Sequence, residues 1–194
     1  MDRGRLEAFS DGVLAIVITI TVLEFPRPEG TQTWDDVIAH ELPPLLIAYI
    51  LSFVYVGIYW NNHHHLLKTT HHVTASIMWS NLLLLFWLSL FPFITLWVGE
   101  NHTTTPPTVA YGIVLLGAAL SYFLLQNRIL VAHGGKDSDL GQALGRDWKG
   151  WSSLGIYLLA ILVAFASPLA AQILYAVVAV MWFIPDRRLV PVAH

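Results

Sequence analysis

Six long apolar stretches, separated by short polar connections, run along the 194-residue chain. At about 1.5 Å per helical residue, stretches of this length cross all or most of a bilayer core of about 30 Å. The pattern predicts a single all-α membrane domain, residues 1–194, with six transmembrane helices over residues 5–24, 45–60, 77–98, 108–130, 151–166 and 169–184. Pro92 predicts a kink in the third helix. The short fifth and sixth helices are expected to be tilted or partly interfacial.

The composition is that of a polytopic membrane protein. Hydrophobic residues make up 56% of the chain and charged residues 12%, about half the charge of a typical soluble domain. Cysteine is absent, which excludes a disulfide framework, a thiolate metal site and a cysteine nucleophile. The first apolar stretch lacks a small-residue cleavage site, so we expect a retained helix and not a signal peptide. No catalytic motif or basic patch indicates an enzyme or a nucleic-acid partner.

The basic residues predict how the helices cross the membrane. Alternate connections and the two termini hold all but one of the ten Lys and Arg residues, namely Arg3, Arg5, Lys68, Arg128, Lys136, Arg146, Lys149, Arg187 and Arg188. The other side holds only Arg27. Because basic residues collect on the cytoplasmic side, this split predicts six helices with both termini cytoplasmic. We expect the membrane to be the plasma (inner) membrane. It argues against a five-helix alternative.

The first helix has two distinct sides. Gly12, Ile16, Thr19 and Leu23 follow a 4-3-4 spacing, which aligns them in one stripe along a helix. Such a stripe is most often a packing seam, but in an oligomer it would form apolar rings with a hydroxyl ring between them, as in a pore wall. Asp11 lies about 140° around the helix from Ile16. Its carboxylate needs a partner, because a bare charge in an apolar helix is costly.

Polar groups within the predicted helices are few. Asp11 and Glu24 bracket the first helix, and no acidic or basic residue lies in the middle of any span. This weighs against a proton-coupled transporter, although an ion-coupled carrier that uses these two acids and the histidines remains the alternative to a channel. His63, His64 and His65 follow the second helix, with His71 and His72 soon after. Adjacent histidines point in different directions, so we favour hydrogen bonds from a histidine here, or from the preceding Asn61 or Asn62, to Asp11 and Ser10 over a metal site or a metalloenzyme.

One motif in the first helix is long enough to be specific. It reads Arg5-x-x-x-Phe9-Ser10-Asp11-Gly12-Val13-x-Ala15-Ile16-x-x-Thr19 and ends in Leu23-Glu24. It resembles the first-helix signature of the transmembrane protein 175 family, potassium channels known from animal endosomes and lysosomes and present also in bacteria and archaea. The run from Tyr59 to His65 is similar to the end of the family's second helix. The six predicted helices match the prokaryotic members, which have one six-helix repeat per chain.

The resemblance implies a homotetrameric potassium channel in which the first helices line a central pore without a TVGYG filter. Ile16 would be the narrow hydrophobic gate, Thr19 the layer tied to potassium preference and Leu23 a further constriction. Arg5, Phe9, Ser10 and Asp11 would fix the first helix against its own subunit, with a partner among His63, His64 and His65. Thr21 lies about 140° from Ile16, so we expect it to face the bundle. We expect monovalent cations as permeant ions, with potassium near Thr19, and no cofactor or resident metal.

Overall fold

The structure is a computed structural model that describes residues 2–23, 25, 37–38, 42–70, 72–138, 141–142 and 147–183. Its main elements are α1 (Arg3–Leu23), α3 (Leu42–Lys68), α4 (Ala75–Ser89), α5 (Phe91–Glu100), α6 (Thr105–Ala132), the short 3-10 helix η2 (Gly135–Asp137), α8 (Trp148–Val163) and α9 (Pro168–Phe183). All regular structure in these residues is helical, so the predicted all-α class is confirmed. Glu24, Arg27, His71, Arg146, Ile184, Arg187 and Arg188 lie outside the described residues.

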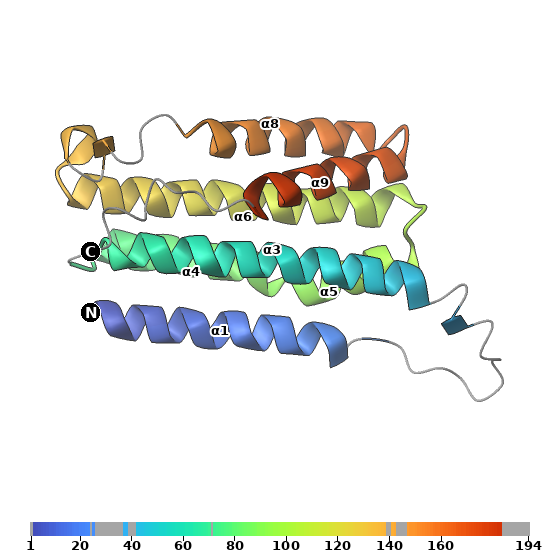
Figure 1. Ribbon diagram of the computed structural model, residues 1–194, viewed down its shortest axis with the longest axis horizontal. Coiled ribbons are helices and arrows are strands. Elements are labelled where there is room, and N and C mark those ends of the chain that lie inside the picture. Colours follow the sequence, from blue (N-terminus) through green and yellow to red (C-terminus); the bar gives the residue numbers. More distant parts are fainter. Residues whose placement is uncertain are drawn as a thin grey trace.

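The helices form an elongated antiparallel bundle (Figure 1). α1 and α3 run in opposite directions, α4 and α5 together form the next passage, and α6, α8 and α9 complete six passages. Four of these are long and apolar enough to cross a membrane: Arg3–Leu23, Leu42–Lys68, Ala75–Glu100 and Thr105–Ala132. α8 and α9 have 16 residues each and are also apolar. At about 24 Å they fall short of a full bilayer core of about 30 Å.

The third passage breaks where the sequence predicts a kink. α4 ends at Ser89, and Leu90, with φ −83° and ψ −10°, links it to α5. Pro92 occupies the first turn of α5, where its missing N–H leaves no helical hydrogen bond unmade. The helix is therefore interrupted within two residues of Pro92, where the sequence predicts a kink.

A chain of buried hydroxyl groups crosses the centre of the bundle. The Thr95 hydroxyl donates to Ser52 Oγ at 2.6 Å, and Ser52 Oγ lies 2.9 Å from the Tyr111 hydroxyl. A second set begins with Tyr55, whose hydroxyl donates to the Tyr175 carbonyl oxygen at 2.5 Å. Because an unpaired polar group is costly in an apolar interior, these bonds fix how α3, α5, α6 and α9 sit against one another.

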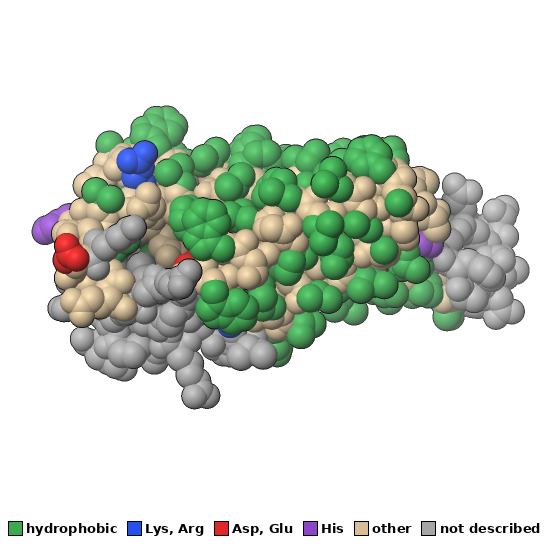
Figure 2. All heavy atoms as spheres, turned by 90° about the horizontal axis from the view of Figure 1, so that it is seen from above, with side chains coloured by type: hydrophobic (Ala, Val, Ile, Leu, Met, Phe, Trp, Pro, Cys, Tyr) green, Lys and Arg blue, Asp and Glu red, His purple; other side chains and the backbone are tan. Residues whose placement is uncertain are grey.

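Charge and hydrophobicity are separated along the bundle. Figure 2 shows hydrophobic side chains over much of the face that contains α8 and α9, with the Lys, Arg, Asp and Glu side chains of this view toward one end. The half of the bundle in which α1 begins carries all the basic residues of the described ranges, namely Arg3, Arg5, Lys68, Arg128, Lys136 and Lys149. That distribution is what a bundle spanning a bilayer requires; which side is cytoplasmic stays a prediction.

Candidate pore-lining helix and its support

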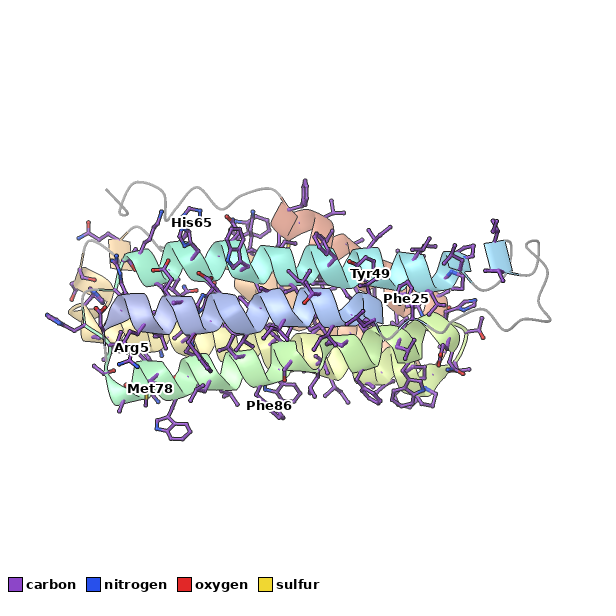
Figure 3. The ribbon with its side chains drawn as sticks, turned by 90° about the horizontal axis from the view of Figure 1, so that it is seen from below. Arg5, Phe25, Tyr49, His65, Met78 and Phe86 are labelled. Atoms are coloured by element: carbon purple, nitrogen blue, oxygen red, sulfur yellow. The ribbon has the colours of Figure 1, made fainter. Side chains whose placement is uncertain are left out.

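α1 lies in the crevice between α3 and the α4–α5 passage, and its outer face is uncovered in the subunit (Figure 3). Its inner face is one helical stripe of buried residues: Leu6, Ser10, Leu14, Val17 and Thr21. Spacings of four and three residues place these side chains on one side of the helix. Thr21 is 5% exposed, so it faces the bundle, as the helical count from Ile16 predicts.

The opposite face of α1 carries the four residues of the predicted stripe. Ile16 is 57% exposed and Leu23 is 77% exposed, and both Gly12 and Thr19 are exposed as well. A methyl group on Gly12 would meet no atom within 4 Å. The Thr19 hydroxyl lies 2.9 Å from the Ala15 carbonyl oxygen and 3.1 Å from that of Ile16. In this subunit the stripe is thus an unpartnered surface of apolar and hydroxyl groups.

A shallow groove of about 390 Å³ runs beside this face, between α1 and the broken passage. Val13, Ile16 and Ile20 form its α1 side, and Ser89, Pro92, Phe93 and Leu96 form the other. The interruption between α4 and α5 lies in this wall. The stripe and the groove together make a continuous surface that no other described part of the chain covers.

A buried three-residue chain fixes the inner face of α1. Asn81 of α4 donates from Nδ2 to Ser10 Oγ at 2.9 Å, and its Oδ1 lies 2.6 Å from His63 Nε2 of α3. Ser10 in turn donates to the Leu6 carbonyl oxygen at 2.8 Å. All three side chains are at most 1% exposed. These hydrogen bonds tie α1, α3 and α4 together through side chains that water does not reach.

A second, more open set of contacts joins α1 to α3 near the same end. Trp60 donates from Nε1 to Asp11 Oδ1 at 3.0 Å, and His64 Nδ1 lies 2.8 Å from Glu7 Oε1. The Trp60 and His64 rings are stacked with centroids 6.1 Å apart. Here the structure corrects the expected pairing: the hydrogen bond that it shows for Asp11 comes from Trp60 and not from one of the three histidines.

The three consecutive histidines, His63 to His65, make different contacts. His63 reaches Ser10 through Asn81, and His64 pairs with Glu7. His65 is partly buried and its ring contacts that of His64 edge-on at 5.7 Å. Among the residues that the structure describes, no group of three or more His, Asp or Glu side chains is placed to hold a metal ion.

The two remaining motif residues lie on the surface. Arg5, labelled in Figure 3, is exposed in the first turns of α1, and Phe9 is 52% exposed. Asn81 was missed at the sequence level, although a lone amide inside an apolar helix is itself a sign that a buried partner exists. Trp60 was missed because a tryptophan at a helix end is also typical of the membrane interface.

Comparisons with known proteins agree with this architecture. The profile of the family described as "Endosomal/lysosomal potassium channel TMEM175" matches residues 5–92. A potassium channel of Chryseobacterium sp. (strain P1-3) is 48% identical over 97% of this chain and 96% of its own length. The endosomal/lysosomal proton channel TMEM175 of Gallus gallus is 33% identical over 47% of this chain and 20% of its own length.

A solved structure extends the likeness to the fold. The crystal structure of a lysosomal potassium-selective channel TMEM175 homolog from Chamaesiphon minutus matches with a TM-score of 0.78 and 26% sequence identity. The match covers 94% of this chain and 96% of that one. The matched family profile includes α1, with its exposed stripe, and the residues that hold its inner face. The chain therefore belongs to the TMEM175 family of membrane channels.

Proposed function

We propose that this chain forms a homotetrameric, potassium-preferring cation channel in which four copies of α1 surround a passive pore. The observation that carries the proposal is the two-sided character of α1. Its inner stripe is buried, whereas Ile16 and Leu23 stay 57% and 77% exposed on the uncovered side. A single stripe cannot enclose a pore, so the arrangement requires further copies of the chain. Its relatives among the bacterial potassium channels support this conclusion.

Ile16 is proposed as the narrow gate and Leu23 as a second apolar ring, with Gly12 leaving room at one end. Apolar constrictions stop ions by excluding water, so the barrier depends on the polarity of the ring. Thr19 lies between the two rings, and its hydroxyl is within hydrogen-bond distance of two carbonyl oxygens of its own helix. When it donates its proton there, its oxygen lone pairs are left to face a potassium ion. One ring of hydroxyl oxygens offers few ligands, so we expect a modest preference for potassium over sodium.

The polar contacts at the start of α1 are proposed to hold the pore helix in register. Ser10 and Asp11 contribute through Asn81 and Trp60, and His63 and His64 complete the attachment to α3. Arg5 and Phe9 near the start of α1 and His65 near the end of α3 lie at this same end of the two helices. We place this end at the cytoplasmic side of the plasma membrane, because it carries the basic residues of the described helices.

Potassium is proposed as the permeant ion in preference to the proton. The relative called a potassium channel matches 97% of this chain, whereas the relative called a proton channel matches 47%. The stripe also lacks a titratable group. Planar-bilayer recordings under opposed potassium and sodium gradients, and then under a pH gradient, distinguish the two ions. Unitary steps that reverse toward the proton potential would contradict the proposal, as would saturable flux without steps, the behaviour of a carrier.

The gate is tested by Ile16→Asn. An amide ring wets the constriction, so we expect a larger potassium conductance than in the parent. Leu162→Asn is the matched control, because Leu162 is 69% exposed on α8, on the far side of the bundle from α1. An unchanged conductance in Ile16→Asn, with an intact tetramer by native mass spectrometry, would remove Ile16 as the gate.

The hydroxyl layer is tested by Thr19→Ala. We expect the potassium and sodium permeabilities to become more similar, because the ring loses its oxygen ligands. Thr21→Ala removes a hydroxyl from the same helix that is buried and donates to the Val17 carbonyl oxygen at 2.7 Å. This control should keep the selectivity of the parent. Equal selectivity in both variants and the parent would exclude Thr19 from the filter.

A further inference from the structure

A long apolar groove of about 600 Å³ lies between α3 and α9. Figure 1 shows α3 between α1 and α9, so this groove is separate from the proposed pore face. Its walls run from Pro44 to Val54 on α3 and from Leu169 to Phe183 on α9. The volume is within the range of about 300–1,000 Å³ that is typical of small-molecule sites.

The lining chemistry favours an apolar occupant along most of the groove. Tyr111 and Tyr175 form part of the floor, but their hydroxyls are turned to Ser52 Oγ at 2.9 Å and to the Thr108 carbonyl oxygen at 3.1 Å. Gln172 donates its amide to the His102 carbonyl oxygen at 2.7 Å. These polar groups therefore already have partners within the protein, and what faces the groove is ring and aliphatic surface.

The groove has the direction and length of a lipid chain. The α3 wall from Pro44 to Val54 extends about 15 Å, at about 1.5 Å per residue, which is half of a bilayer core of about 30 Å. α3 and α9 run along the bundle axis, which is also the direction of the surrounding acyl chains (Figure 1). The rim is apolar and open, with Ile47 and Val180 each 67% exposed, whereas Ala48 and Ala179 on the floor are 6% and 3% exposed.

The contact between the two walls limits what can enter. Tyr55 of α3 donates its hydroxyl to the Tyr175 carbonyl oxygen of α9, so the two helices touch beneath the groove. Helices in contact lie about 8–10 Å apart, and a third helix with its side chains is about 10–12 Å wide. Such a helix would rest on the rim, whereas a single hydrocarbon chain fits between the walls. The hydrophobic surface of the α8–α9 face, seen in Figure 2, places bilayer lipid beside the groove.

We propose that this groove holds one acyl chain of a membrane phospholipid, in the leaflet at the end of the bundle where α3 and α9 begin. His102, at the same end, marks the level of the headgroup. The site does not depend on which ion the pore conducts, so a failed binding test leaves the proposed channel function untouched.

Native mass spectrometry of the delipidated protein, titrated with dioleoyl phosphatidylethanolamine, tests the proposal. We expect one tightly held lipid per chain, and at least a tenfold loss of affinity in Ala176→Trp, which fills the groove. Val177→Trp is the control, because Val177 is the next residue of α9, is 50% exposed and does not line the groove. Equal affinity in Ala176→Trp and the parent would overturn the proposal.

Two further measurements need no bulky substitution. A dihexanoyl lipid with the same headgroup should bind at least tenfold more weakly, because its chains fill only part of the groove; equal binding would mean that the headgroup alone is recognised. The chain has no cysteine, so Ile173→Cys on the rim is a unique probe. Oxidation that links two Ile173→Cys chains efficiently would show that a second copy covers the groove, which also overturns the proposal.

Discussion

Asn81→Leu tests whether the buried chain between Ser10 and His63 holds the pore helix in place. Leucine has nearly the shape of asparagine, so the substitution removes two hydrogen bonds and leaves little cavity. The Ser10 hydroxyl keeps its own bond to the Leu6 carbonyl oxygen at 2.8 Å. His63 Nε2 loses its hydrogen bond to Asn81. The other ring nitrogen, Nδ1, has no partner among the described residues, so the imidazole is left without a hydrogen bond.

These two losses differ in size. The bond to Ser10 is an ordinary interhelical hydrogen bond in a membrane, which measures about 0.6 kcal/mol on average. The imidazole of His63, 1% exposed, loses the hydrogen bond at Nε2, and leaving that buried nitrogen unpaired costs about 1–3 kcal/mol. We therefore expect a total loss of about 1.5–3.5 kcal/mol in the free energy of unfolding. At about 1.4 kcal/mol per factor of ten, the unfolding equilibrium changes between about 10-fold and 300-fold.

The assay is reversible unfolding in mixed micelles with a rising fraction of dodecyl sulfate, followed by the fluorescence of the eight tryptophans. Ser80→Ala is the control, because Ser80 is buried beside Asn81 but donates only within its own helix, to the Ser76 carbonyl oxygen at 2.8 Å. Asn81→Leu combined with His63→Phe removes the unpaired group and should recover most of the loss. A single-variant loss below about 1 kcal/mol, or a double variant no more stable than the single one, would refute the reasoning.

The same unfolding assay checks two further predictions. Gly117→Ala places a methyl group against the Trp87 ring and should lower the free energy of unfolding by about 1–3 kcal/mol. Gly155→Ala has open space at the added carbon, so it should be neutral or stabilising by up to about 1 kcal/mol. Similar values for the two variants would contradict this account of α4–α6 packing. Glu7→Gln removes the carboxylate charge from the partly exposed pair with His64, so the loss in the free energy of unfolding should stay below about 1 kcal/mol. A loss above about 2 kcal/mol would mean that the pair is a main attachment of α1.

The sequence alone was informative wherever one helix decides the outcome. Apolar length predicts the passages, because a bilayer core sets how many helical residues are needed. The break at Pro92 follows from the missing N–H of proline. Helical periodicity predicts that Gly12, Ile16, Thr19 and Leu23 share a face and that Thr21 does not, and the structure has the first four exposed and Thr21 buried. Each of these results depends on geometry that is repeated within a single element.

Pairings between helices were decided only by the tertiary structure. The sequence shows that Asp11 needs a partner and offers three adjacent histidines, yet the hydrogen bond comes from Trp60, and His64 pairs with Glu7. The rotation of α3 about its own axis and its offset along α1 decide which residue in each turn of α3 contacts α1. Both depend on packing elsewhere, such as the Ser52, Tyr55 and Tyr175 contacts deep in the bundle. A local periodicity contains no information about that rotation, because it is set by the sum of contacts with every neighbouring helix.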